Sequence, residues 1–384
     1  MPRFPEIADA ASATRGAVYS TVAARLAAHS GERYPLHIGD TWMEPPAGCR
    51  MEDLHVAEYP GMHRYAPVAG LPTLLEAIAA RVSARSGQAT AVDELLITSG
   101  ATGALAAAVT AIAGPGDEVL ILAPYWPLIE GIVHQRLAIP VPVPAFAGEV
   151  ADAEALIAAL EARLSPRSVA VYLNTPNNPT GRVLPRAWVE AVAAWARSRG
   201  LWILADEVYE DYIYAGEHVY TRPLAPERTL AAHSFSKAYG MAGNRCGYLI
   251  GPAEVIVHAR KAAAHTFYST PTAAQIAAER VLAGPGDAWV RDARARYQAL
   301  GEAAAARLGV PAPAGSTFLF LDVAEHLDER GLGGLLERCA DRGLLIAPGP
   351  SFGPYPTHVR LCFTSAPPEV VERGVEILAA ILGR

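Results

Sequence analysis

A lysine lies in an uncharged stretch of this chain, SFSKAYGMAGNR at residues 234–245. Lys237 has no acidic residue within four positions on either side, so a local ion pair does not explain it. When a lysine is removed from water or placed near another cation, its amine becomes less basic and can act as a nucleophile. Arg245, the next charged residue, could grip a phosphate with its planar guanidinium group. The stretch therefore predicts a reactive amine beside an anion-binding arginine.

Polar side chains also follow two apolar runs that are typical of buried strands. Asp206 lies in WILADE (202–207), directly after apolar or small residues. A buried carboxylate needs a partner or must take up a proton, and the alternative is an aspartate that caps a helix. The segment NTPNNPTG (174–181) supplies the amides of Asn174 and Asn178, and its alternative is an ordinary turn.

Three further segments contain residues that could bind a ligand. SGATG (99–103) is expected to open a helix, where free backbone N–H groups bind anions, although a simple helix cap has the same composition. Trp126 in PYWP could present a flat indole face to a planar ring, or it could be part of the core. Arg360 lies between apolar residues in VRLCF. Its burial requires an anion, which is either a ligand or an acidic side chain of the protein.

The strand-like runs alternate with helical patterns at 101–113, 151–163 and 186–199. This order predicts an α/β fold with a mostly parallel sheet flanked by helices. Several runs are apolar throughout, as expected for strands covered on both faces. Ligands of such sheets bind beyond the carboxyl ends of the strands, so the polar residues should converge there. The predicted strands are 95–98, 118–123, 168–174, 202–207, 229–234 and 247–251.

After about residue 285 the pattern changes to a long helix, three shorter strand-like runs and further helices. We expect this region to form a smaller α+β domain together with the N-terminal segment. The predicted division is an N-terminal arm and part of the small domain at 1–45, a large ligand-binding domain at 46–285, and a C-terminal small domain at 286–384.

Composition excludes several classes of function. The 384 residues carry a formal net charge of −7, which gives no basic surface for nucleic acid. The four cysteines are far apart and form no CxxC motif, which argues against a zinc site and a disulfide framework. The uncharged stretch 95–116 breaks at Ser-Gly and Gly-Pro-Gly, which favours a strand-turn-helix unit over a membrane span. With no signal peptide at the N-terminus, we expect a cytoplasmic protein.

Taken together, the strand-end residues form one chemical set. It comprises a nucleophilic lysine, a buried carboxylate, an aromatic face, an amide donor and a phosphate cradle with an arginine. Pyridoxal 5′-phosphate requires this set, because its aldehyde forms a Schiff base with a lysine and its ring nitrogen needs a carboxylate to stay protonated. No metal ion is expected.

The sequence resembles the class I/II aminotransferases, the aspartate aminotransferase family of pyridoxal-phosphate-dependent fold type I. The resemblance spans nearly the whole chain in the family's order. The blocks that carry it are YAPVAGLPTLLEAIA (65–79), SGATGAL, PYWP, NTPNNPTG, ADEVY, SFSKAYGMAGNRCGY, PGPSFG (348–353) and VRLCF (359–363). It implies a large domain with the sheet and a smaller domain from both chain ends.

The resemblance also implies a role for each matching residue. Lys237 would form the aldimine with the cofactor and then shuttle a proton, and Asp206 would pair with the ring nitrogen. Arg360 would bind the substrate's α-carboxylate, and Gly39 would close over it. Asn178 and Tyr209 would bond the cofactor's 3′-oxygen. The remaining contacts would be stacking by Trp126, phosphate binding by Gly100, Ala101, Thr102, Ser234 and Arg245, and a phosphate contact by Tyr65 from the neighbouring subunit of a homodimer.

The resemblance implies a ping-pong aminotransferase that acts on an L-amino acid and a 2-oxo acid, 2-oxoglutarate or pyruvate. A lyase, cyclase or oxidase of an amino acid on the same fold is the alternative. Members specific for dicarboxylates have an arginine where this chain has His265, so a preference for aspartate by that route is not expected. Trp42 could cover the pocket and favour an apolar substrate, or it could serve only in packing.

Overall fold

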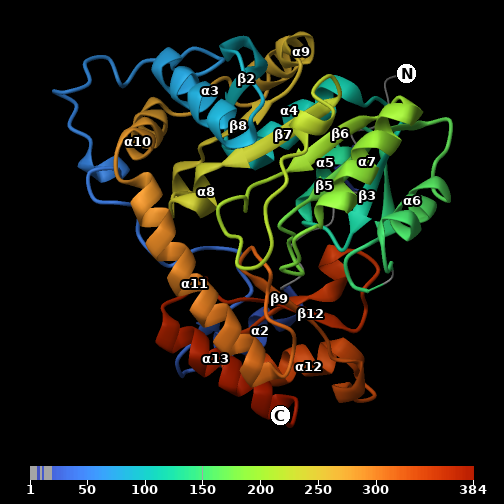
Figure 1. The fold of residues 1–384 in the computed structure, drawn as a ribbon. Coiled ribbons are helices and arrows are strands. Elements are labelled where there is room, and N and C mark those ends of the chain that lie inside the picture. The colour runs from blue at the N-terminus through green and yellow to red at the C-terminus, as the bar shows by residue number, and fades with distance from the viewer. Residues whose placement is uncertain (1–6, 9–10, 13–19, 149) are drawn as a thin grey trace, which may run out of the picture.

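The computed structural model describes residues 7–8, 11–12, 20–148 and 150–384. Its centre is a seven-stranded sheet in the order β2-β8-β7-β6-β5-β3-β4 (Figure 1), in which β8 runs antiparallel to the other six strands. The strands are β2 (Leu95–Thr98), β3 (Glu118–Ala123), β4 (Ile139–Pro144), β5 (Ser168–Asn174), β6 (Trp202–Asp206), β7 (Thr229–Ser234) and β8 (Gly247–Ile250). The predicted α/β class and the six predicted strand positions are confirmed.

The sequence analysis missed β4, the edge strand, because its sequence is IPVPVP. Proline lacks the backbone N–H that a central strand uses, so within sheets it is confined mainly to edges. At an edge strand one side has no neighbour within the sheet. The same prolines that argue against a strand are therefore tolerated here.

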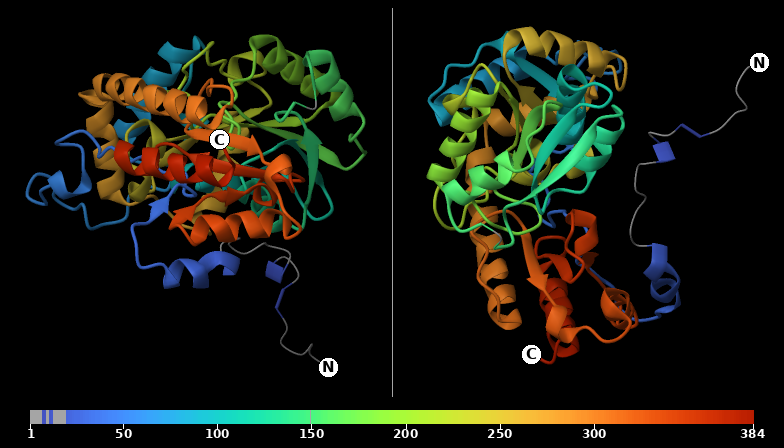
Figure 2. Two further views of the ribbon diagram at one scale, coloured as in Figure 1. Left: turned by 90° about the horizontal axis from the view of Figure 1, so that it is seen from below. Right: turned by 90° about the vertical axis from the view of Figure 1, so that its right-hand side faces the viewer.

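Helices cover both faces of the sheet, which explains why its strands are apolar throughout (Figures 1 and 2). One face packs on α4 (Gly100–Ile112), α5 (Leu128–His134) and α9 (Ala253–Ala264). The other packs on α6 (Ala153–Glu161) and α7 (Arg186–Arg199), while α3 (Pro72–Ser86) and α10 (Thr272–Ala283) cover the β2–β8 end. The helices at 101–113, 151–163 and 186–199 were predicted within two residues of these ends.

A second, smaller layer lies below the large sheet in Figure 1 and has its own apolar core. It contains the antiparallel sheet β11-β12-β9 and a two-stranded pair of β1 with β10. Its elements are β1 (Tyr34–Pro35), α11 (Gly286–Leu308), β9 (Phe318–Asp322), α12 (Gly331–Ala340), β10 (Leu344–Leu345), β11 (Ala347–Pro348), β12 (His358–Cys362) and α13 (Pro368–Ile381). The helix α2 (Ser20–Ala28) lies against α12.

The long helix α11 joins the two layers. Val290, near its start, packs in the core of α3 and α10, whereas Tyr297 and Leu308 pack in the core of the smaller layer. The predicted boundaries after residues 45 and 285 remain predictions. In the described part of the chain, no helix is long and apolar enough to cross a lipid bilayer.

Candidate active site

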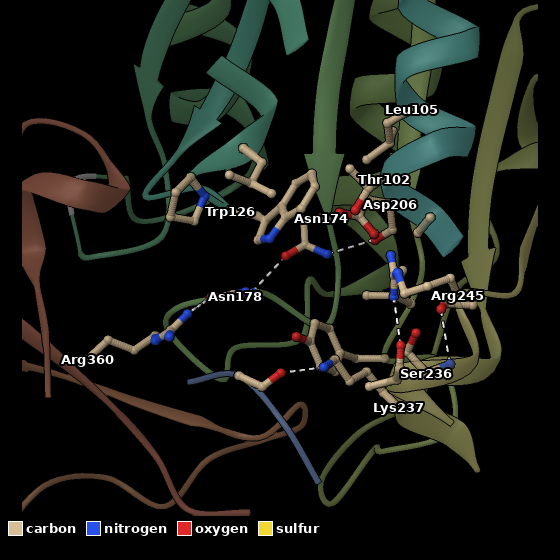
Figure 3. Close-up of a pocket in the computed structure, with 18 residues that line it drawn as sticks. Thr102, Leu105, Trp126, Asn174, Asn178, Asp206, Ser236, Lys237, Arg245 and Arg360 are labelled. Carbon is tan, nitrogen blue, oxygen red and sulfur yellow. Dashed lines mark hydrogen bonds between the residues drawn. The ribbon is translucent and has the colours of Figure 1, made fainter. Parts of the chain in front are cut away.

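A cavity of about 300 Å³ lies where the large sheet meets the smaller layer (Figure 3). It opens at the carboxyl ends of β5, β6 and β7, at Asn174, Asp206 and Ser234. Most of the residues predicted from the sequence line it. These residues are Gly39, Ala101, Thr102, Trp126, Asn178, Asp206, Tyr209, Ser234, Lys237, Arg245 and Arg360.

Lys237 reaches the cavity from α8 (Phe235–Ala238), a short helix that directly follows β7. Its Nζ donates a hydrogen bond to the main-chain carbonyl of Gly39. Burial lowers the pKa of the Lys237 amine, and Asp40 opposes this effect in part. A less basic amine is more often neutral at physiological pH, which is the form that attacks a carbonyl group.

Asp206 ends β6 and is only 3% exposed. The Tyr172 hydroxyl donates a 2.7 Å hydrogen bond to its Oδ2, and the Asn174 side-chain amide donates to its main-chain carbonyl at 2.8 Å. Its other carboxylate oxygen, Oδ1, is buried and has no hydrogen-bond partner among the residues that the structure describes. Burial raises the pKa of Asp206 to about 6, against the opposing bond from Tyr172. The unsatisfied oxygen fits a positively charged N–H donor from a ligand.

The wall of the cavity at the start of α4 is built from small residues. Gly100 has a φ of +68°, and a Cβ there would lie 2.5 Å from a guanidinium nitrogen of Arg245. A Cβ at Gly247 would lie 2.9 Å from the backbone nitrogen of Ala101. The first N–H groups of a helix have no partner within the helix and carry its positive dipole end. Together with Arg245 and the Ser234 hydroxyl, this cradle fits a phosphate.

Arg360 enters from β12 of the smaller sheet and is 6% exposed. It donates to Asn178 Oδ1 at 3.0 Å and to the main-chain carbonyl of His37. Its guanidinium carbon lies 4.3 Å from the ring centre of Phe318 and 4.7 Å from that of Phe352. Two aromatic faces therefore hold this cation at the cavity wall.

Tyr209 is buried, and its ring meets that of Phe318 edge-on with the ring centres 5.7 Å apart. Burial raises the pKa of the Tyr209 hydroxyl, whereas Arg360 lowers it. The phenol is therefore a neutral donor at physiological pH. Trp126 is half-buried; it lines the cavity and also packs against the core under α4 and α5, so its stacking on a ring remains a prediction.

Three predicted site residues are not among those that line this cavity: Gly100, which lies directly before Ala101 in the chain, Trp42 and Tyr65. Trp42 packs against the core of the smaller layer, and its backbone N–H donates to the Thr364 carbonyl at 2.8 Å. This position fits the alternative that Trp42 serves in packing. Tyr65 is 85% exposed, and its ring centre lies 4.9 Å from that of Tyr268. Its predicted contact from a neighbouring subunit remains a prediction. His265 follows the last residue of α9 and is exposed.

The sequence analysis missed Tyr172, Phe318 and Phe352. Tyr172 could have been found, because it lies two residues before Asn174 in a strand and so points to the same face of the sheet. The two phenylalanines reach Arg360 only through tertiary packing. Within the described residues, no group of three or more His, Cys, Asp or Glu side chains could hold a metal ion.

Residues 43–378 match the family of class I and II aminotransferases. The chain is 33% identical over 333 residues to the aspartate/prephenate aminotransferase of Thermus thermophilus, which covers 84% of each chain. It is 34% identical over 339 residues to the arginine–pyruvate transaminase of Pseudomonas aeruginosa, which covers 85% of this chain and 84% of that one. A solved structure of a Thermus thermophilus aspartate aminotransferase single mutant matches with a TM-score of 0.89 and 29% identity, covering 98% of this chain and 100% of that one. The chain therefore belongs to the class I and II aminotransferases, which depend on pyridoxal phosphate.

Proposed function

We propose that this aminotransferase binds pyridoxal 5′-phosphate in the cavity and moves the amino group of an L-amino acid to a 2-oxo acid. The observation that carries the proposal is the Oδ1 atom of Asp206, which is buried and lacks a hydrogen-bond partner in the described part of the chain. A protonated pyridine nitrogen supplies both the donor and the positive charge that this atom needs.

The residues around the cavity divide into those that hold the ring and those that hold the phosphate. Lys237 would bond covalently to the cofactor through its amine, and Asp206 would accept the ring N–H. Asn178 and Tyr209 would bond the 3′-oxygen, and Trp126 would stack on the ring. The phosphate would be bound by Gly100, Ala101, Thr102, Ser234 and Arg245.

When bound, pyridoxal phosphate supplies an electron sink that stabilises negative charge at the substrate's α-carbon. The chain's own residues must orient the substrate and move its proton. Arg360 would bind the α-carboxylate as a planar fork, and the segment at Gly39 would keep water out. The Lys237 amine, when it is not bonded to the cofactor, would take the proton from the substrate's α-carbon and act as the proton shuttle, and its lowered pKa favours the neutral form that this role requires.

The cations that line the cavity are Lys237, Arg245 and Arg360, and each has a role in this proposal. The described cavity thus offers no further cation for a second substrate carboxylate, which supports pyruvate or a donor with an uncharged side chain. The names of the relatives include prephenate and pyruvate as well as aspartate. Because His265 stands where dicarboxylate-specific members have an arginine, 2-oxoglutarate would need another contact, which a second subunit could supply.

We propose a homodimer in which Tyr65 of each protomer reaches the other's phosphate site. The high exposure of Tyr65 supports this proposal. The three-part domain division and the cytoplasmic location also remain proposals. The comparisons do not favour a lyase, cyclase or oxidase, because the named relatives are aminotransferases.

A half-reaction tests the proposed function. The protein loaded with pyridoxal phosphate is mixed with single L-amino acids without an acceptor, and the cofactor and released products are quantified. Transamination predicts one keto acid per active site and conversion of the cofactor to pyridoxamine phosphate. Continuous release of ammonia or keto acid would contradict the proposal. Adding pyruvate or 2-oxoglutarate in separate reactions then identifies the acceptor.

A further inference from the structure

Tyr172 lies in the middle of the large sheet, and its hydroxyl donates a 2.7 Å hydrogen bond to Asp206 Oδ2. From this bond we propose that Tyr172 is a positioning residue, which orients the Asp206 carboxylate and keeps it anionic for the ring nitrogen. The inference rests on the proposed function, since it concerns the group that would pair with the cofactor.

The register of the sheet fixes this contact. Tyr172 and Asn174 on β5 lie beside Leu204 and Asp206 on β6, with the pairs Tyr172–Leu204 and Asn174–Asp206 directly opposite. Residues two apart in a strand point to the same face. Tyr172 is fully buried in the core under α4, so its ring is held by packing. One strand therefore contacts Asp206 twice, at Oδ2 through Tyr172 and at the main-chain carbonyl through Asn174.

The hydrogen bond from Tyr172 makes the two carboxylate oxygens of Asp206 different. Oδ2 accepts from the hydroxyl of a fully buried tyrosine, whereas Oδ1 is buried and has no partner among the described residues. With Oδ2 held by this hydrogen bond, Oδ1 is the oxygen left for a ligand. A bound pyridinium would then meet a preorganised acceptor.

The charge state of Asp206 also depends on this hydroxyl. Burial raises the pKa of Asp206, whereas the bond from Tyr172 opposes protonation. A protonated Asp206 would present an O–H donor, which the protonated ring nitrogen cannot accept. The other titratable groups near Asp206 or across the cavity are Glu207, Tyr209, His233, Lys237, Arg245 and Arg360.

The test compares two cofactors in the wild-type protein, in the variant Tyr172→Phe and in a control variant. Pyridoxal phosphate and its deaza analogue, in which C–H replaces the ring nitrogen, are titrated into wild-type apoprotein and into Tyr172→Phe. The matched control is Tyr214→Phe, which also removes a 2.7 Å hydroxyl donor, here from the main-chain carbonyl of Ser316. Thermal unfolding of each apoprotein verifies that the variants are folded.

Wild type should bind pyridoxal phosphate more tightly than the analogue, and Tyr172→Phe should reduce that ratio by about tenfold or more, as for loss of a hydrogen bond to a charged group. Tyr214→Phe should keep the wild-type ratio. In addition, NMR of an isotopically labelled ring nitrogen should show that the cofactor loses its ring proton at lower pH in Tyr172→Phe than in wild type. An unchanged ratio and an unchanged titration in Tyr172→Phe would overturn the inference. Failure of wild type to bind pyridoxal phosphate would instead overturn the proposed function.

Discussion

The guanidinium of Arg360 donates a 3.0 Å hydrogen bond to the side-chain oxygen of Asn178, which links the smaller sheet to the end of the large one. Arg360 comes from β12 and Asn178 from the turn after β5, 182 positions apart in the chain. One bond thus connects the proposed substrate-binding cation with a proposed cofactor-binding amide. The substrate's carboxylate and the ring it reacts with would be positioned by a single contact across the cavity.

Replacing Arg360 with alanine should chiefly weaken the binding of substrates that carry an α-carboxylate. Loss of one member of a buried, paired group costs about 3–5 kcal/mol, which corresponds to an increase in KM of roughly a hundredfold or more. Arg360→Lys should fall between wild type and alanine, because it retains the charge without the planar fork. Steady-state kinetics with an amino acid and its carboxamide provide the measurement. Equal losses for both substrates would place Arg360 outside the carboxylate site.

Asp206 should make cofactor binding sensitive to pH. Its pKa of about 6 in the cofactor-free chain lies above the usual value of 3.8, so the carboxylate becomes protonated and loses its affinity for a pyridinium as the pH falls through 6. The folded state binds this proton more tightly than the unfolded state. Asp206 therefore lowers apoprotein stability as the pH rises from 3.8 to about 6.

The variant Asp206→Asn separates these effects. Above about pH 6 its apoprotein should be more stable than wild type by up to about 3 kcal/mol, because no buried charge remains, while its cofactor affinity should be lower. Chemical denaturation at about pH 5 and about pH 8 measures the first effect, and cofactor titration the second. A wild-type apoprotein whose stability relative to Asp206→Asn did not change with pH would contradict the raised pKa.

The residues of this site that could be predicted from the sequence are those that lie at the ends of strands. Asn174, Asp206 and Ser234 end adjacent parallel strands, so their convergence follows from the alternation of strands and helices alone. The face of the sheet on which Tyr172 lies follows from its position two residues before Asn174. Its bond to Asp206 depends on the register of β5 against β6, which the positions of the strands in the chain do not give.

The aromatic faces around Arg360 could not be predicted for a related reason. Phe318 and Phe352 come from β9 and from the turn after β11, and their positions depend on how the smaller layer packs. The residue type alone did not show which tryptophan would reach the cavity. Trp126 lines the cavity and also packs against the core under α4 and α5, whereas Trp42 packs against the core of the smaller layer.

Gly100→Ala should weaken binding of the cofactor's phosphate. A Cβ at this position would lie 2.5 Å from the Arg245 guanidinium, and the φ of +68° would be strained by about 1–2 kcal/mol. Gly200→Ala is the control, because it has a φ of +71° and its Cβ would meet no atom of the described chain within 4 Å. Both variants should lose similar stability in chemical denaturation.

Only Gly100→Ala should lose cofactor affinity, by about tenfold or more if a charge-assisted contact is displaced. Titration with pyridoxal phosphate and with pyridoxal, which lacks the phosphate, measures this difference. Pyridoxal should bind equally to both variants. If Gly100→Ala weakened pyridoxal as much as pyridoxal phosphate, the small-residue cradle would not be the phosphate site.

A partly buried charge cluster lies outside the cavity and should stabilise the fold. Arg85 pairs with Asp211 at 2.7 Å and with Glu210 at 3.5 Å. Burial alone would raise the pKa of Glu210, but His233 and Arg85 hold it below its usual value. Arg85→Met should therefore lower the free energy of unfolding by about 1–3 kcal/mol near neutral pH, less than for a fully buried pair because the Arg85 side chain is 28% exposed.

The loss in Arg85→Met should become smaller as the pH falls, because the uncompensated carboxylates can then take up protons. Arg186→Met is the control. Its partner Glu217 lies at 2.9 Å, but their side chains are 53% and 62% exposed, so the expected loss is about 0–1 kcal/mol. Denaturant unfolding at two pH values measures both variants, and equal losses would contradict a stabilising role for the cluster.

The most direct test of the central proposal is to locate the covalent bond to the cofactor. The chain contains two lysines, Lys237 in the cavity and Lys261 in the last turn of α9. The protein loaded with pyridoxal phosphate is reduced with borohydride, digested and analysed by mass spectrometry, alongside Lys237→Ala and Lys261→Ala. We predict the reduced cofactor on the peptide of Lys237 in wild type and Lys261→Ala, with no label and no turnover in Lys237→Ala. Label on Lys261 alone, or turnover retained by Lys237→Ala, would contradict the proposal.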